Sequence, residues 1–86
     1  MVTKNVVLTA PNGMHARPAT ELVKLAKSLD GKVTLATEVK SVNATSMLGI
    51  LSLGLKSGAQ IVVTADGGSE EANLNAVVDF IANITE

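Results

Sequence analysis

The sequence predicts an α+β fold, with a four-stranded antiparallel sheet that carries two long helices and one short helix on one face. Two patterns lead to this prediction. Some segments alternate apolar and polar residues, and others repeat apolar residues three and four positions apart. In chain order these segments read strand, helix, strand, strand, short helix, strand, helix. The 86 residues suffice for one domain, and we expect residues 1–86 to form it.

The first part of the chain predicts a strand over residues 2–8 and a helix that begins near Ala16. The turn formers Pro11-Asn12-Gly13 separate the two elements. Pro18 falls in the first helical turn, where its missing N–H costs nothing, and Asp30-Gly31 is the expected stop. The apolar stripe of this helix consists of Ala19, Leu22, Val23, Ala26 and Leu29.

Two short strands, connected at Glu38-Val39, are expected next. The first covers residues 32–37, with Val33 and Leu35 facing inward, and the second runs through Val42. Because a β-branched residue such as Val39 rarely adopts a positive φ, we expect a turn that does not need that conformation.

A short helix is expected from Met47 to about Ser52, with Thr45-Ser46 at its N-cap and Gly54 at its end. It has too many apolar residues for one buried face. We expect Ile50 and Leu53 to pack in the core. Three others are expected to form an exposed adhesive patch: Met47, Leu48 and Leu51.

The last strand and helix are predicted most clearly. Residues 60–66 alternate, with Ile61, Val63 and Ala65 on one face, and Gly67-Gly68 breaks the strand. Ser69 is the expected cap of the final helix. Glu70 and Glu71 lie in its first turn, where the positive end of the helix favours acidic side chains. The apolar stripe of that helix consists of Leu74, Val77, Val78, Ile81 and Ile84.

The composition excludes several classes of function. One Phe, with neither Trp nor Tyr, cannot form the aromatic surface on which single-stranded nucleic acid stacks, so no direct nucleic-acid binding is expected. The absence of cysteine excludes disulfides, thiolate zinc sites and a cysteine nucleophile. A single histidine cannot form a multi-histidine metal cluster, so neither a metal nor another cofactor is expected.

No targeting signal is visible. The first residues lack a basic segment followed by a long apolar stretch. The longest apolar run, residues 47–55, is interrupted by Gly49, Ser52 and Gly54, whereas a membrane-spanning helix needs about 20 apolar residues. We therefore expect a cytoplasmic protein without membrane insertion.

Charge is distributed unevenly along the chain. Residues 1–56 hold seven basic and three acidic residues, a net charge of +4, whereas residues 57–86 hold five acidic residues and no basic one, a net charge of −5. The asymmetry points to a site for an anion or an acidic partner in the first part of the chain. Chance in so short a chain is the alternative.

His15 follows a turn and precedes a predicted helix, which places it at or beside the N-cap. The backbone N–H groups of Ala16 and Arg17 then have no partner within the helix, and a helix N-terminus attracts phosphate. Arg17 adds a guanidinium that can bind two phosphate oxygens. The imidazole can attack phosphorus and later leave. This combination favours reversible histidine phosphorylation; the alternative is an ordinary surface histidine near an unrelated arginine.

Two motifs resemble those of a known family. Met14-His15-Ala16-Arg17-Pro18-Ala19 resembles the active-site signature of HPr, the histidine-containing phosphocarrier of the bacterial phosphoenolpyruvate:sugar phosphotransferase system. Lys40-Ser41-Val42-Asn43, followed by residues 46–54, resembles the family's second signature around a regulatory serine. The resemblance covers essentially the whole chain. It implies the HPr-like open-faced two-layer sandwich, βαββαβα.

The resemblance also implies a function and a site. His15 would accept a phosphoryl group on Nδ1 from enzyme I, which draws it from phosphoenolpyruvate, and would donate it to sugar-specific enzyme IIA proteins. The chain would act as a stoichiometric carrier rather than an enzyme, and as a monomer. Arg17 would steady the phosphoryl group, supported by Ala16, Pro18 and Asn12. The expected partner interface consists of Thr20, Lys24, Lys27, Met47, Leu48 and Leu51.

Ser46 has two compatible interpretations. Locally it is an N-cap, which contributes about 1 kcal/mol and needs no regulation. The resemblance implies that HPr kinase/phosphorylase phosphorylates Ser46 with ATP, and that the product binds a catabolite-control transcription factor. Gly49 agrees with the serine-regulated, sugar-related branch, whereas Val39 departs from the Gly that many members carry. The alternatives are a purely regulatory or nitrogen-branch relative, and an interaction module in which His15 is incidental.

Overall fold

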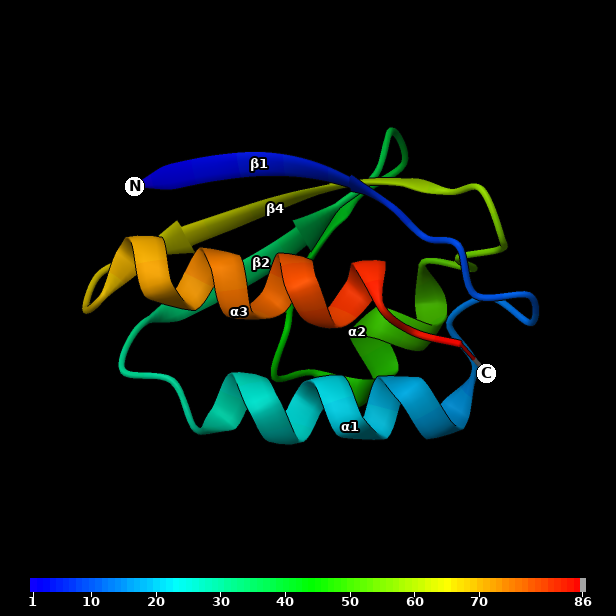
Figure 1. Cartoon of the computed structure of the whole chain (residues 1–86), viewed down its shortest axis with the longest axis horizontal. Helices are drawn as coiled ribbons and strands as arrows, with labels where there is room; N and C mark the ends of the chain where they lie inside the picture. The colour runs from blue at the N-terminus through cyan, green and yellow to red at the C-terminus, as the bar shows by residue number, and fades with distance from the viewer. Residues whose placement is uncertain (86) are drawn as a thin grey trace.

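The order of elements in the computed structural model, which describes residues 1–85, confirms the prediction. The elements are β1 (Val2–Val7), α1 (Ala16–Lys27), β2 (Lys32–Ala36), β3 (Ser41–Asn43), α2 (Met47–Ser52), β4 (Gln60–Asp66) and α3 (Glu70–Ala82). The strands form one antiparallel sheet in the order β1-β4-β2-β3. The helices lie to one side of this sheet, with α1 and α3 next to each other and α2 near the start of α1 (Figure 1).

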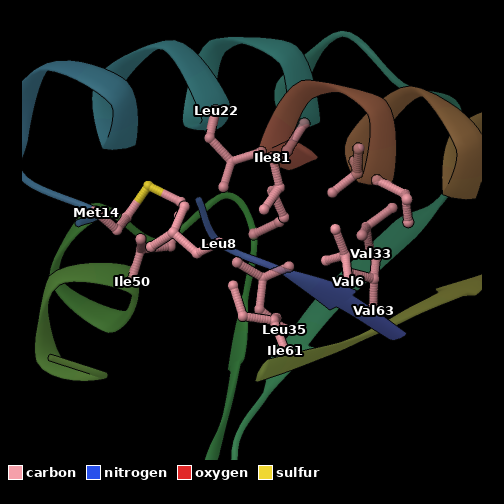
Figure 2. Packing of buried hydrophobic residues seen from close by; sticks show 14 of the residues in the cluster. Val6, Leu8, Met14, Leu22, Val33, Leu35, Ile50, Ile61, Val63 and Ile81 are labelled. Carbon is pink, nitrogen blue, oxygen red and sulfur yellow. The ribbon is translucent and has the colours of Figure 1, made fainter. Parts of the chain in front are cut away.

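The hydrophobic core lies between the sheet and the helices. Val6 pairs with Ile61, and Leu35 pairs with Val63, so the inward residues of three neighbouring strands line up across the sheet. Figure 2 shows Leu22 of α1 and Ile81 of α3 projecting toward these strand residues. The inward residues predicted for β2 and β4 are all buried. The alternation of residue types is therefore sufficient to identify the core face of the sheet.

The predicted helical stripes are largely confirmed. All five residues predicted for the stripe of α3 are buried, but Ile84 lies beyond the helix, which ends at Ala82. In α1, Ala19, Leu22 and Ala26 are buried and Val23 is half-buried, whereas Leu29 is half-buried but lies beyond the end of the helix. The strands β1 and β2 each end one residue earlier than predicted. Within residues 1–85, no helix combines the length and apolar character required to cross a membrane.

Two predictions about the helix ends are wrong: where α1 stops, and which side chain caps α3. The helix α1 ends at Lys27, before Asp30-Gly31. Ser69 is the N-cap residue of α3, but its side chain makes no capping hydrogen bond. Instead, the Asp30 carboxylate accepts hydrogen bonds from the Ser69 N–H at 3.0 Å, the Ser69 hydroxyl at 3.0 Å and the Asn73 side chain at 2.9 Å. The residue predicted to stop α1 thus caps α3.

This arrangement favours the ionised form of Asp30. The Ser69 N–H lowers the pKa of the Asp30 carboxyl most, followed by the Asn73 side chain and the Ser69 hydroxyl. The carboxylate also lies at the N-terminus of α3, where a negative charge is favourable. The hydrogen bonds to Asp30 therefore hold the loop after α1 against the start of α3.

The connection between β2 and β3 agrees with the expectation for Val39. No residue other than glycine has a positive φ in the described part of the chain. The turn is closed by the Thr37 N–H, which donates to the Lys40 carbonyl at 2.9 Å, and by the Val39 N–H, which donates to the Thr37 hydroxyl at 3.2 Å. Val39 itself projects outward and is 84% exposed.

Candidate functional site

The backbone just before His15 is held on the core by two hydrogen bonds. The Gly13 N–H donates to the Ala10 carbonyl at 3.0 Å, and the Met14 N–H donates to the Leu55 carbonyl at 2.9 Å. The side chain of Met14 is buried and lies with Leu8 and Ile50 in Figure 2. Sequence reasoning took Met14 only as a part of a motif. In the structure it anchors the residue that follows it.

Gly13 is needed at its position for two independent reasons. Its φ is +68°, a conformation that residues with a Cβ rarely adopt. A Cβ on Gly13 would also overlap the Leu55 carbonyl oxygen and would lie 3.0 Å from the Lys56 Cα. The chain therefore approaches the loop after α2 so closely that only glycine fits.

His15 is the N-cap residue of α1, as predicted. Its backbone is extended, with φ −89° and ψ −174°, and its carbonyl accepts the first helical hydrogen bond from the Ala19 N–H at 3.1 Å. The side chain of His15 makes no capping bond. Among residues 1–85, no group accepts a hydrogen bond from the Ala16 N–H. The start of α1 therefore retains a backbone donor for an anion, and the His15 side chain is not used as a cap.

The two ring nitrogens of His15 differ in accessibility. Nε2 is buried and has no hydrogen-bond partner in the described chain. Nδ1 is not buried in this way, and no residue that the structure describes hydrogen-bonds to it. Nε2 is therefore the ring nitrogen that the fold closes off from an incoming electrophile.

The other residues predicted at this site lie around the first turn of α1. Arg17 and Ala16 are exposed, whereas Pro18 is buried, so the proline packs inward and leaves the solvent side to its neighbours. Asn12 is exposed in the preceding turn. The first turn of α1 carries no acidic residue that would repel an anion. Within residues 1–85, no group of three or more acidic, histidine or cysteine residues is arranged to hold a metal ion.

The short helix α2 contacts α1 beside this site. The Thr20 hydroxyl of α1 lies 3.9 Å from the Met47 Sδ at the start of α2. Leu48 is 83% exposed and Leu51 is 39% exposed, as expected for a surface patch. Met47 is half-buried rather than exposed, because it packs against the hydrophobic core, and Leu53 is half-buried rather than a full core residue.

Lys24 and Lys27 are both exposed in the last turn of α1. At 1.5 Å of rise per residue they lie roughly 14 and 18 Å along the helix from His15. These positions place them outside the immediate site, on the same helix. They can act on the site only through long-range electrostatics or through a partner that spans the helix.

Ser46 caps α2, as predicted from the sequence. Its Oγ accepts a hydrogen bond from the Gly49 N–H at 3.0 Å. The side chain is half-buried. A Cβ on Gly49 would lie 3.0 Å from the Ser46 Oγ and 3.0 Å from the Val42 Cβ, so the glycine keeps the space next to the hydroxyl open.

Comparisons with known proteins agree with this geometry. Residues 2–83 match the family model described as "PTS HPr component phosphorylation site". The phosphocarrier protein HPr of Borreliella burgdorferi is 34% identical over 86 residues, which is the full length of both chains. The structure of HPr from Bacillus anthracis is 34% identical, with a TM-score of 0.89, covering 93% of this chain and 95% of that one. Crh, the Bacillus subtilis catabolite-repression protein described as a swapped dimer, is 29% identical, with a TM-score of 0.78 and coverage of 100% and 99%.

Proposed function

The chain belongs to the HPr family, the phosphocarriers of the phosphotransferase system, and from this we propose that His15 is its phosphoryl-accepting residue. The phosphoryl group comes from phosphorylated enzyme I and originates from phosphoenolpyruvate. His15 then donates the phosphoryl group to enzyme IIA proteins during sugar uptake. The observation that carries the assignment is the position of His15 at the N-cap of α1, where its side chain makes no capping bond and its Nε2 is buried.

The proposed step is a displacement at phosphorus. The Nδ1 lone pair forms an N–P bond while the bond between phosphorus and the donor breaks, and the reverse step passes the group on. The Ala16 N–H and the positive end of α1 attract the phosphoryl oxygens. Arg17 adds a guanidinium on the same turn, while Asn12 and Pro18 help to hold the histidine in place. The chain acts as a stoichiometric carrier that is loaded and unloaded by other proteins.

The proposed docking surface for both partners consists of the exposed side of α1 and α2. Leu48 and Leu51 provide exposed apolar area on α2, and Thr20 and Met47 form a contact between α1 and α2. Lys24 and Lys27 attract acidic partners and chiefly affect the rate of encounter. We propose that residues 1–86 act as one monomeric domain in the cytoplasm.

The proposal is tested by incubating the chain with enzyme I and phosphoenolpyruvate. We expect one phosphoryl group per chain, bound by a bond that acid hydrolyses and alkali leaves intact, because phosphohistidine has those properties and phosphoserine survives acid. A reaction without enzyme I is the control. Absence of acid-labile phosphate on the complete mixture would contradict the carrier role.

A second proposal concerns Ser46, which we propose as the substrate of HPr kinase/phosphorylase. A phosphate here would add about two negative charges next to the docking surface. Repulsion of an acidic partner is expected to slow phosphoryl transfer from enzyme I by more than about tenfold. The modified chain would instead bind a catabolite-control transcription factor. The likeness to Crh supports regulation of this type, whereas His15 and Arg17 favour a carrier over a purely regulatory or nitrogen-branch relative.

Ser46→Ala is the variant that tests this second proposal. With ATP and the kinase, we expect acid-stable phosphate on the wild type and none on the variant, which also loses about 1 kcal/mol of stability with the cap. Ser52→Ala is the matched control, because Ser52 is exposed on the same helix and donates to the Gly49 carbonyl at 2.6 Å. Equal phosphorylation of wild type and Ser46→Ala would exclude Ser46 as the site.

A further inference from the structure

The thioether of Met47 occupies the contact between α1 and α2, at the edge of the proposed docking surface. Its Sδ lies 3.9 Å from the Thr20 Oγ1, and the side chain is half-buried. The chain contains three methionines and no cysteine. Met14 is only 5% exposed, and Met1 is 77% exposed but precedes β1. Met47 is therefore the one oxidisable sulfur on this surface.

The contact with Thr20 connects Met47 to the first turn of α1. The Thr20 hydroxyl donates its single proton to the Ala16 carbonyl at 2.7 Å, so the sulfur receives only a weak contact. A sulfoxide oxygen is a much stronger hydrogen-bond acceptor than a thioether sulfur. On an oxidised Met47, that oxygen would compete with the Ala16 carbonyl for the proton of the Thr20 hydroxyl. Ala16 directly follows His15, so this competition would take place next to the proposed phosphorylation site.

We propose that Met47 is a site of reversible oxidation to methionine sulfoxide and that the modification weakens docking of the phosphoryl donor. Hydrogen peroxide supplies the oxygen atom. The sulfur–oxygen bond forms as the O–O bond breaks, the sulfur loses two electrons, and peroxide is reduced to water. Methionine sulfoxide reductases reverse the change. The oxidised side chain places a polar group within the apolar patch formed with Leu48 and Leu51.

The modification itself is tested without any partner protein. The folded chain is treated with dilute hydrogen peroxide, and the added oxygen is mapped by peptide mass spectrometry over time. We expect Met47 to be oxidised at least about tenfold faster than Met14, since reactivity follows exposure of the sulfur. In urea the two rates should converge. Equal rates in the folded chain, or a slower rate at Met47, would overturn the assignment.

The effect on docking rests on the proposed function and needs a second measurement. The initial rate of phosphorylation by enzyme I, at carrier concentrations below saturation, is measured before and after peroxide treatment. For the wild type we expect the ratio of the treated rate to the untreated rate to be about 0.1, a roughly tenfold loss, because a polar group enters an apolar contact. Addition of a methionine sulfoxide reductase should restore the rate.

Met47→Leu is the comparison, with each protein measured against its own untreated rate. The variant retains Met1 and Met14, so any loss due to those residues appears in both proteins. We expect a ratio near one for Met47→Leu. An equal fall in both proteins, or no fall in the wild type, would overturn the docking effect. If the untreated wild type accepts no phosphate, the carrier function fails, while the mass spectrometry still decides whether Met47 is oxidised selectively.

Discussion

His15→Ala is expected to reduce phosphoryl acceptance from enzyme I by at least about 10³-fold, because removal of a nucleophile eliminates the covalent route rather than weakening it. The described chain offers no second histidine or cysteine to replace it. The measurement is the acid-labile phosphate formed per chain with excess enzyme I and phosphoenolpyruvate. A His15→Ala chain that is loaded at the wild-type rate would show that another residue is the acceptor.

The same substitution should leave the fold intact, which makes the functional loss interpretable. The His15 side chain makes no capping hydrogen bond, and the buried Nε2 has no partner in residues 1–85. Its removal therefore breaks no hydrogen bond within that part of the chain. The unfolding free energy should change by less than about 1 kcal/mol. A cooperative thermal transition close to that of the wild type is the expected control result.

The parts of the fold that sequence patterns predicted are those in which neighbouring residues decide the outcome. The alternation around Val33 and Ile61 and the helical spacing around Val77 identify buried faces without knowledge of tertiary structure. The same is true of the helix starts at His15 and Ser46, since a turn or a small polar residue precedes a run with helical spacing. Two separate motifs were sufficient to indicate the family.

The features that sequence reasoning missed depend on residues far apart in the chain. The cap of α3 comes from Asp30, 39 residues before Ser69, and no local pattern connects the two. The position of Met47 depends on the packing of α2 against α1, so its half-burial could not be read from a short apolar run. The burial of Nε2 of His15 is likewise a property of the folded chain that no local pattern predicts. The element order was therefore more predictable than the detailed geometry of the site.

Gly13→Ala is expected to lose more stability than the other variants proposed above and to disturb His15 indirectly. Alanine in the left-handed conformation costs about 1–2 kcal/mol, and the overlap with the Leu55 carbonyl adds a further 1–3 kcal/mol, roughly. A loss of about 3 kcal/mol should lower the melting temperature by roughly 15 °C in a domain of this size. Denaturant unfolding and thermal melts followed by circular dichroism measure both quantities.

Gly54→Ala separates the two causes of that loss. Gly54 has a φ of +62°, close to the +68° of Gly13, but a Cβ at Gly54 would meet no atom within 4 Å. The control should therefore lose only the conformational part, about 1–2 kcal/mol. Equal losses in the two variants would show that Leu55 does not hold the turn. If the close approach does position His15, Gly13→Ala should also accept phosphate more slowly under conditions where it is still folded, because the Met14 N–H and the Leu55 carbonyl can no longer keep their 2.9 Å hydrogen bond.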